Sequence, residues 1–198
     1  MSMRGPPTTG TRRIEVDIYL TYRGQIPSKT SSLDAVWSMR KSFHSQLQKL
    51  WGKEPFAILK KWEDSNFAAG APNFLRQIGD QIFVPFYSEV VGVGVKLEIK
   101  LLTGLPLQQA VISSGDLDNR VKRIIDALRA PTQKGELTKN LEPGSRWYCV
   151  MDDDSSVKEV TASLAPYLDS SDPSESFVFV RVRTSPSAVT LANLAMLF

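Results

Sequence analysis

The feature that most limits how this chain can fold is a long alternation of apolar residues between positions 90 and 102. On one side of this stretch every second residue is apolar: Val91, Val93, Val95, Leu97, Ile99 and Leu101. Because side chains along a β-strand point alternately to opposite faces, the pattern predicts a long strand with one buried face. An apolar stretch at 81–86 predicts a second strand just before it, and we expect the two to form a hairpin.

Two further stretches carry apolar residues at the three- and four-residue spacing of amphipathic helices. They cover positions 33–51 and 118–130, and Pro131 ends the second. The stretches 52–79 and 131–146 are predicted to be rich in loops. Additional strands are predicted at 14–20, 147–151, 157–164 and 177–182. The expected fold class is therefore α+β, a mixed β-sheet packed against helices.

The length of 198 residues fits one domain with a sizeable core. We expect a disordered N-terminal tail over residues 1–11, a single domain over 12–183 and an apolar C-terminal tail over 184–198. No apolar run is long enough to cross a membrane, and the N-terminus lacks the apolar core of a signal peptide. These features predict a cytoplasmic protein without a membrane partner.

The sequence has one cysteine, Cys149, and one histidine, His44. A single cysteine excludes a disulfide framework within the chain and a cysteine-rich zinc site. Catalysis by histidine is also poorly supplied, because His44 lies on the first predicted helix, where a surface or packing role is more common. Cys149 lies in a predicted strand beside two aromatic residues and is expected in the core.

Acidic residues are concentrated in two short segments, 116–119 and 152–154. Asp116, Asp118 and Asn119 open the second predicted helix, and Asp152, Asp153 and Asp154 follow a predicted strand. Carboxylates this close raise each other's pKa unless a cation lies between them. Hard oxygen ligands in this number suit Mg²⁺ or Mn²⁺. The two segments together predict a metal site for phosphate chemistry.

The spacing suggests a role for each polar side chain. Asp116 and Asp118 are predicted to lie across a strand-to-helix junction and to converge on one point, which Asp153 or Asp154 would reach from a neighbouring strand. Lys122 lies one helical turn after Asp118, where it could contact the scissile phosphate. Cationic residues nearby could hold other phosphates of DNA. These DNA-binding candidates are Arg120 and Arg123 on the same helix, and Arg40 and Lys41 on the solvated face of the first helix.

The same residues also have structural explanations. Asp118 could cap its helix, and an ion pair between Asp118 and Lys122 predicts the same four-residue spacing. Three consecutive aspartates often form a turn, so only two of residues 152–154 need face the site. Asp126 is more commonly a structural bonding partner than a metal ligand.

Charge is distributed unevenly along the chain. The net charge is +3, but the first 100 residues hold five more basic than acidic residues, whereas the rest hold two more acidic than basic ones. A basic body around an acidic centre suits a polyanion held by its backbone with metal ions at the reacting phosphate. By itself this imbalance favours nucleic acid only slightly.

The motif residues resemble those of the RusA family of Holliday junction resolvases. That family has a D-x-D-N-x-x-K motif opening a helix that ends in D-A-L, and a D-D-x-x-V motif on a later strand. The corresponding segments here are residues 116–122, 126–128 and 153–157. The chain is longer than a compact family member, and the segment 43–51 is similar to an uncharacterised RusA-like subgroup from bacteria and their prophages.

The resemblance implies a homodimeric, Mg²⁺-dependent endonuclease that cleaves four-way DNA junctions in recombination and repair, without a small-molecule cofactor. Carried over by motif, Asp116, Asp118 and Asp154 are the expected metal-binding acids, with Asp153 beside them, and Lys122 is the essential lysine. Two alternatives remain open. One is another metal-dependent nuclease acting on RNA, flaps or forks, and the other is a catalytically silent nucleic-acid-binding module.

Overall fold

The computed structural model describes residues 17–27, 33–54, 56–63, 73–104, 114–138 and 141–186, apart from the side chains of Ile58, Trp62 and residues 114–116. The longer elements are β1 (Asp17–Gln25), α1 (Leu33–Leu50), α2 (Ala57–Trp62), β2 (Arg76–Ile78), β3 (Gln81–Tyr87), β4 (Val93–Thr103), α4 (Ser114–Leu128), β5 (Arg146–Met151), β6 (Val157–Pro166) and β7 (Glu175–Pro186). Three short 3-10 helices are η1 (Glu89–Val91), η2 (Lys134–Glu136) and η3 (Asp154–Ser156). The predicted α+β fold class is confirmed.

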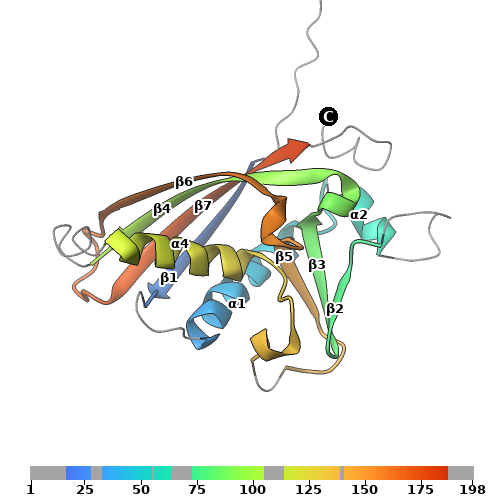
Figure 1. Cartoon of the computed structure of the whole chain (residues 1–198), viewed down its shortest axis with the longest axis horizontal. Coiled ribbons are helices and arrows are strands. Elements are labelled where there is room, and N and C mark those ends of the chain that lie inside the picture. The colour runs from blue at the N-terminus through green and yellow to red at the C-terminus, as the bar shows by residue number, and fades with distance from the viewer. Residues whose placement is uncertain are drawn as a thin grey trace, which may run out of the picture.

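The larger sheet has the strand order β1-β7-β4-β6. β7 runs antiparallel to both β1 and β4, whereas β6 runs parallel to β4 and forms one edge. The apolar face predicted for β4 is confirmed, because Val93, Val95, Leu97, Ile99 and Leu101 are all almost completely buried. Helix α4 lies across this buried face, and α1 lies beside α4 (Figure 1).

The smaller sheet has the order β2-β3-β5, with β3 and β5 parallel. Its central strand β3 is buried along nearly all of its length, and Phe86 packs edge-to-face against Trp51 and Phe56. Helix α1 packs on β5, and its buried residues Trp37, Phe43 and Leu47 include part of the predicted apolar stripe.

The predicted hairpin of β3 and β4 is wrong. The two strands belong to different sheets, and an isolated bridge joins Val93 of β4 to Ser88, which follows β3. Between them η1 ends at Gly92, whose φ of 70° lies in the left-handed region that glycine adopts without strain. This turn sends the chain out of the smaller sheet and into the larger one.

The connection from β3 to β4 and the connection from β5 to β6 both pass from the smaller sheet to the larger one. A buried carboxylate joins the two sheets at this point. Asp152 follows β5 and is only 5% exposed. Its Oδ2 accepts hydrogen bonds from Ser88 Oγ (2.5 Å) and Arg76 Nη2 (3.2 Å), and its Oδ1 accepts one from Ser156 Oγ (2.8 Å). Both oxygens are therefore occupied by side chains of the crossing segments, and the role of Asp152 is structural.

Several other expectations differ from the structure. The stretch 52–79 contains α2 and β2, and the last strand continues to Pro186. The predicted solvated position of Arg40 is wrong, because this side chain is only 2% exposed. The prediction missed it because Arg40 caps carbonyl oxygens of a helix distant in sequence, which periodicity within α1 cannot reveal. The predicted N-terminal tail and residues 187–198 of the C-terminal tail lie outside the described residues.

Among the described ranges, no helix is both long enough and apolar enough to cross a membrane.

We predict that Asp152→Ala strongly destabilises the fold. The change leaves two buried hydroxyl groups and the Arg76 guanidinium without their acceptor, which should lower the free energy of unfolding by about 3 kcal/mol. Urea denaturation followed by tryptophan fluorescence measures this loss. The exposed neighbour provides the control, since Asp154→Ala should change stability little. Equal losses in the two variants would contradict a structural role specific to Asp152.

Candidate active-site groove

Helix α4 presents three polar side chains, each four residues from the next, beside its buried face. Ile124, Ala127 and Leu128 are buried in the core. Asp118, Lys122 and Asp126 follow one another one turn apart, so they lie on one face of the helix. The shared face predicted for Asp118 and Lys122 is confirmed, since both line the same pocket.

The three consecutive aspartates after β5 have three different environments. Asp152 is buried at the crossing described above. Asp153 caps η3, where its Oδ1 accepts the Ser155 backbone N–H at 3.0 Å. That backbone hydrogen bond, with the Ser155 hydroxyl, holds the pKa of Asp153 below its ordinary value. Asp154 is exposed. A structural explanation, the alternative considered for these three aspartates, therefore applies to Asp152 and Asp153.

Asp154 meets the polar face of α4 in a pocket of about 480 Å³, which we call the acidic groove. Its polar side chains are Asp118, Lys122, Asp126 and Asp154. Its apolar walls are Val121 and Ile125 from α4, and Val157 and Val160 from β6, the strand that follows η3. The groove thus joins residues of the two acidic segments, although residues 119–153 separate Asp118 from Asp154 along the chain.

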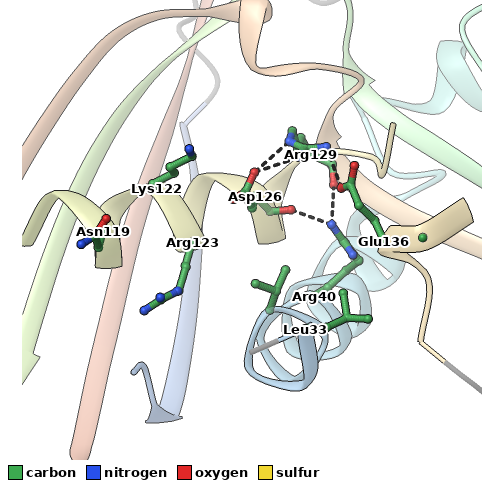
Figure 2. Close-up of a pocket in the computed structure, with 10 residues that line it drawn as sticks. Leu33, Arg40, Asn119, Lys122, Arg123, Asp126, Arg129 and Glu136 are labelled. Carbon is green, nitrogen blue, oxygen red and sulfur yellow. Dashed lines mark hydrogen bonds and ion pairs between the residues drawn. The ribbon is translucent and has the colours of Figure 1, made fainter. Parts of the chain in front are cut away.

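Asp126 has two roles in this arrangement. It lines the groove, and its Oδ1 accepts from Arg129 Nε at 3.0 Å, while Arg129 Nη1 also pairs with Glu136 Oε2 at 3.1 Å. Figure 2 shows this chain of contacts at the end of α4. The predicted structural bond of Asp126 is confirmed. Arg129 lies three residues after Asp126, a spacing typical of a helical ion pair, whereas the pairing of Arg129 with Glu136 of η2 has no spacing that would predict it.

The donor set suits a hard divalent cation, although it is incomplete in the described part of the chain. Asp118 and Asp154 supply carboxylate oxygens of the kind that Mg²⁺ prefers. Among the described side chains, however, no group of three acidic, histidine or cysteine residues lies close enough to hold a metal ion. The side chain of Asp116 is outside that search, so a third ligand from this residue remains a prediction.

The expected junction around Asp116 differs from the structure. Helix α4 begins at Ser114, so the backbone of Asp116 is already helical and Asp118 lies in the second turn rather than at the N-cap. Residues two apart in a regular helix do not face each other. Convergence of Asp116 and Asp118 therefore depends on the first turn of α4, whose side chains lie outside the description.

The four DNA-binding candidates fall into two groups. Arg120 and Arg40 are buried, at 8% and 2% exposure, which corrects their expected placement on the surface. Arg120 lies on the buried side of α4. Arg40 donates from Nη2 to the carbonyl oxygens of Asp126 (2.6 Å) and Arg129 (3.4 Å). Lys41 is exposed, and Arg123 is half-buried on α4. Only Lys41 and Arg123 retain surface of the kind expected.

His44 and Cys149 have the packing positions expected of them. The His44 ring stacks on Tyr148 at 5.6 Å, its Nδ1 accepts the Tyr148 backbone N–H at 2.9 Å, and burial lowers its pKa. Cys149 is buried, which raises the pKa of its thiol. Neither residue lines the acidic groove.

We predict that the contribution of Asp153 to stability falls in acid. Its folded-state pKa is depressed, so its stabilising bonds are complete above the unfolded value of about 3.9 and are lost as the pH falls through the folded pKa. Asp153→Ala should therefore cost about 1 kcal/mol at pH 7 and less at pH 3. Urea denaturation of both proteins at the two pH values measures the difference. A constant difference would contradict the capping role.

Comparison of the chain with protein-family models, with curated proteins and with solved structures finds no match. The functional interpretation is therefore built on the geometry of the groove and on the motif residues.

Proposed function

We propose that the chain is a Mg²⁺-dependent endonuclease that hydrolyses phosphodiesters in branched DNA such as Holliday junctions. One observation carries the proposal: Asp118, Lys122 and Asp154 line one groove although they come from two segments distant in sequence. The RusA-like motifs imply this combination of acids and lysine. A purely structural origin of the motifs would not require the two segments to meet.

In the proposed site Asp118 and Asp154 bind the metal, Asp116 completes the set from the start of α4, and Asp153 lies beside them. When bound there, Mg²⁺ would supply charge stabilisation at the phosphate and a more acidic bound water. Mn²⁺ has similar ligand preferences and should substitute for it. Lys122 donates to a non-bridging phosphate oxygen as negative charge develops there.

Nucleic acid is the substrate that fits the surroundings of the groove. Lys122 is exposed and lines the groove, which places a cation beside the acids, whereas Arg123 and Lys41 do not line it. Paired cleavage of a four-way junction needs two copies of the site related by two-fold symmetry, so the proposal includes a homodimer. The choice of a branched substrate over flaps, forks or RNA comes from the family resemblance.

The proposal predicts cleavage of a labelled synthetic four-way junction that requires Mg²⁺ or Mn²⁺ and stops with EDTA. Asp118→Asn should reduce the cleavage rate at least about a hundredfold, because a metal ligand is lost, while junction binding is kept or becomes tighter as repulsion of phosphate falls. Asp169→Asn, an exposed loop variant with the same charge change, is the control. Duplex, fork and single strand run in parallel.

Symmetric paired nicks on the junction alone would support the resolvase function. Cleavage of forks or RNA instead would identify a different metal-dependent nuclease. Binding of the junction without cleavage of any substrate would contradict the enzyme and favour a binding module. If Asp118→Asn lost junction binding as well as cleavage, this would contradict the proposal that Asp118 acts in cleavage and that other residues bind the DNA.

Lys122→Ala should lower the cleavage rate about 10²–10³-fold and change junction affinity much less, because its hydrogen bond strengthens in the transition state. Single-turnover rates and gel-shift affinities measured on the same junction separate the two effects. Lys49→Ala, on the exposed last turn of α1, is the matched control. An unchanged rate would contradict a catalytic role for Lys122.

A further inference from the structure

Strand β6 forms an edge of the larger sheet that no described helix or strand covers. It pairs with β4 from Val157 to Pro166, and its residues 158–163 are all exposed. Figure 1 shows β6 along the outer border of this sheet, and no described element lies beyond it in the strand order. The backbone N–H and C=O groups on that side of β6 are therefore available to another strand.

Two other edge strands, β1 and β5, have their backbone groups occupied by side chains of α1. On β1, the Thr21 N–H donates to Gln46 Oε1 at 3.0 Å, and the Thr21 carbonyl oxygen accepts from Gln46 Nε2 at 2.7 Å. On β5, the Tyr148 N–H donates to His44 Nδ1 at 2.9 Å. The remaining edge strand, β2, has only three residues. In the described part of the chain, β6 is thus the long edge strand that lacks such protection, and unprotected edges of this kind pair with other chains.

Two features limit the stretch of β6 that can take part in pairing. Lys158 is an extra residue where the register with β4 shifts, and Pro166 at the other end has no N–H to donate. The regular stretch between them is 159–165, and Ala162 is its centre. Two identical antiparallel strands are related by a two-fold axis, so the longest pairing of β6 with a second copy is centred on Ala162.

On the side of the sheet that carries α4, this register matches apolar residues with apolar residues. Val160, Ala162 and Leu164 pair with buried residues of β4, so they face this side. Val160 would lie opposite Leu164 of the second copy, and Ala162 opposite its own counterpart. Val160 is apolar but 41% exposed, and it lines the acidic groove. Pairing would cover this surface and add an apolar side chain of the second copy beside the groove.

On the opposite side of the sheet, the same register brings no like charges together. Thr161 would lie opposite Ser163, and Glu159 opposite Ala165. Glu159 keeps its ion pair with Lys96, at 2.9 Å within one copy. A pairing centred three residues earlier would instead place Glu159 opposite its own counterpart, which is unfavourable. The strand is therefore complementary to itself on both faces in one register, which favours a second copy as the partner.

We propose that β6 pairs antiparallel with β6 of a second copy, centred on Ala162, so that two four-stranded sheets form one continuous sheet. The two-fold axis of such a pair is perpendicular to the sheet, so both α4 helices and both acidic grooves lie on the same side. The purpose of this pairing rests on the proposed function, since two sites on one side suit a four-way junction. The pairing itself requires neither metal nor DNA.

The test is sedimentation equilibrium of the full chain, in EDTA and without DNA, over a wide range of protein concentration. We expect the wild type to approach twice its mass of 22.0 kDa. Ala162→Lys and Ala162→Glu each place two like charges opposite each other at the axis, which should raise the dimer dissociation constant about fivefold or more. Ala162 is exposed, so both variants should keep the fold of the monomer, which circular dichroism checks.

A mixture of these two variants identifies the register. The mixed dimer would place the lysine of one copy opposite the glutamate of the other, so association should return to at least the wild-type strength. Gln25→Lys adds the same charge as Ala162→Lys at an exposed position of β1, the opposite edge of the sheet, and should dimerise like the wild type.

A monomeric wild type, or equal dimerisation of the wild type and Ala162→Lys, would overturn the proposal. A mixture that associates no better than either variant alone would overturn it as well. Asp118→Asn should remain dimeric, and a wild-type dimer that cleaves no DNA would still support the pairing. Failure of the nuclease function and failure of this interface are therefore distinguishable.

Discussion

The carboxylate of Asp152 is the contact on which the arrangement of the candidate site depends. Two segments cross from the smaller to the larger sheet side by side, and Asp152 bonds to Ser88 in one crossing and to Ser156 in the other. A charged group at 5% exposure is tolerated because both of its oxygens have donors. The turn that follows is set by Asp153, and it brings Asp154 to α4. The position of the exposed acid thus depends on its buried neighbour.

Helix α4 forms part of the wall of two pockets, which share Lys122 and Asp126. Its polar face meets Asp154 and β6 in the acidic groove, and a second pocket lies between α4 and α1. Near the end of the helix, Arg129 pairs with Asp126 and with Glu136.

The failed hairpin shows where local pattern stops being informative. The alternation in β4 correctly predicted a strand and its buried face, because side-chain direction along a strand has a period of two wherever that strand pairs. Pairing itself depends on partners distant in sequence. β4 lies between β7 and β6, and β3 lies between β2 and β5, so neighbouring strands in the chain are not neighbours in a sheet. η1 lies between the two strands, and its Ser88 N-cap and Gly92 C-cap are the only sequence signals of this break.

By itself the sequence determined the properties that depend on spacing within one element. These include the helices around the apolar stripes, the buried face of β4, and the common face of Asp118 and Lys122, which one helical turn requires. Only the tertiary structure decided that Asp154, and not Asp153, lines the groove, and that Arg40 is buried beneath the end of α4. The reason is physical: burial and hydrogen bonding of a side chain depend on the partners that distant segments bring to it, and a periodic pattern within one element carries no information about them.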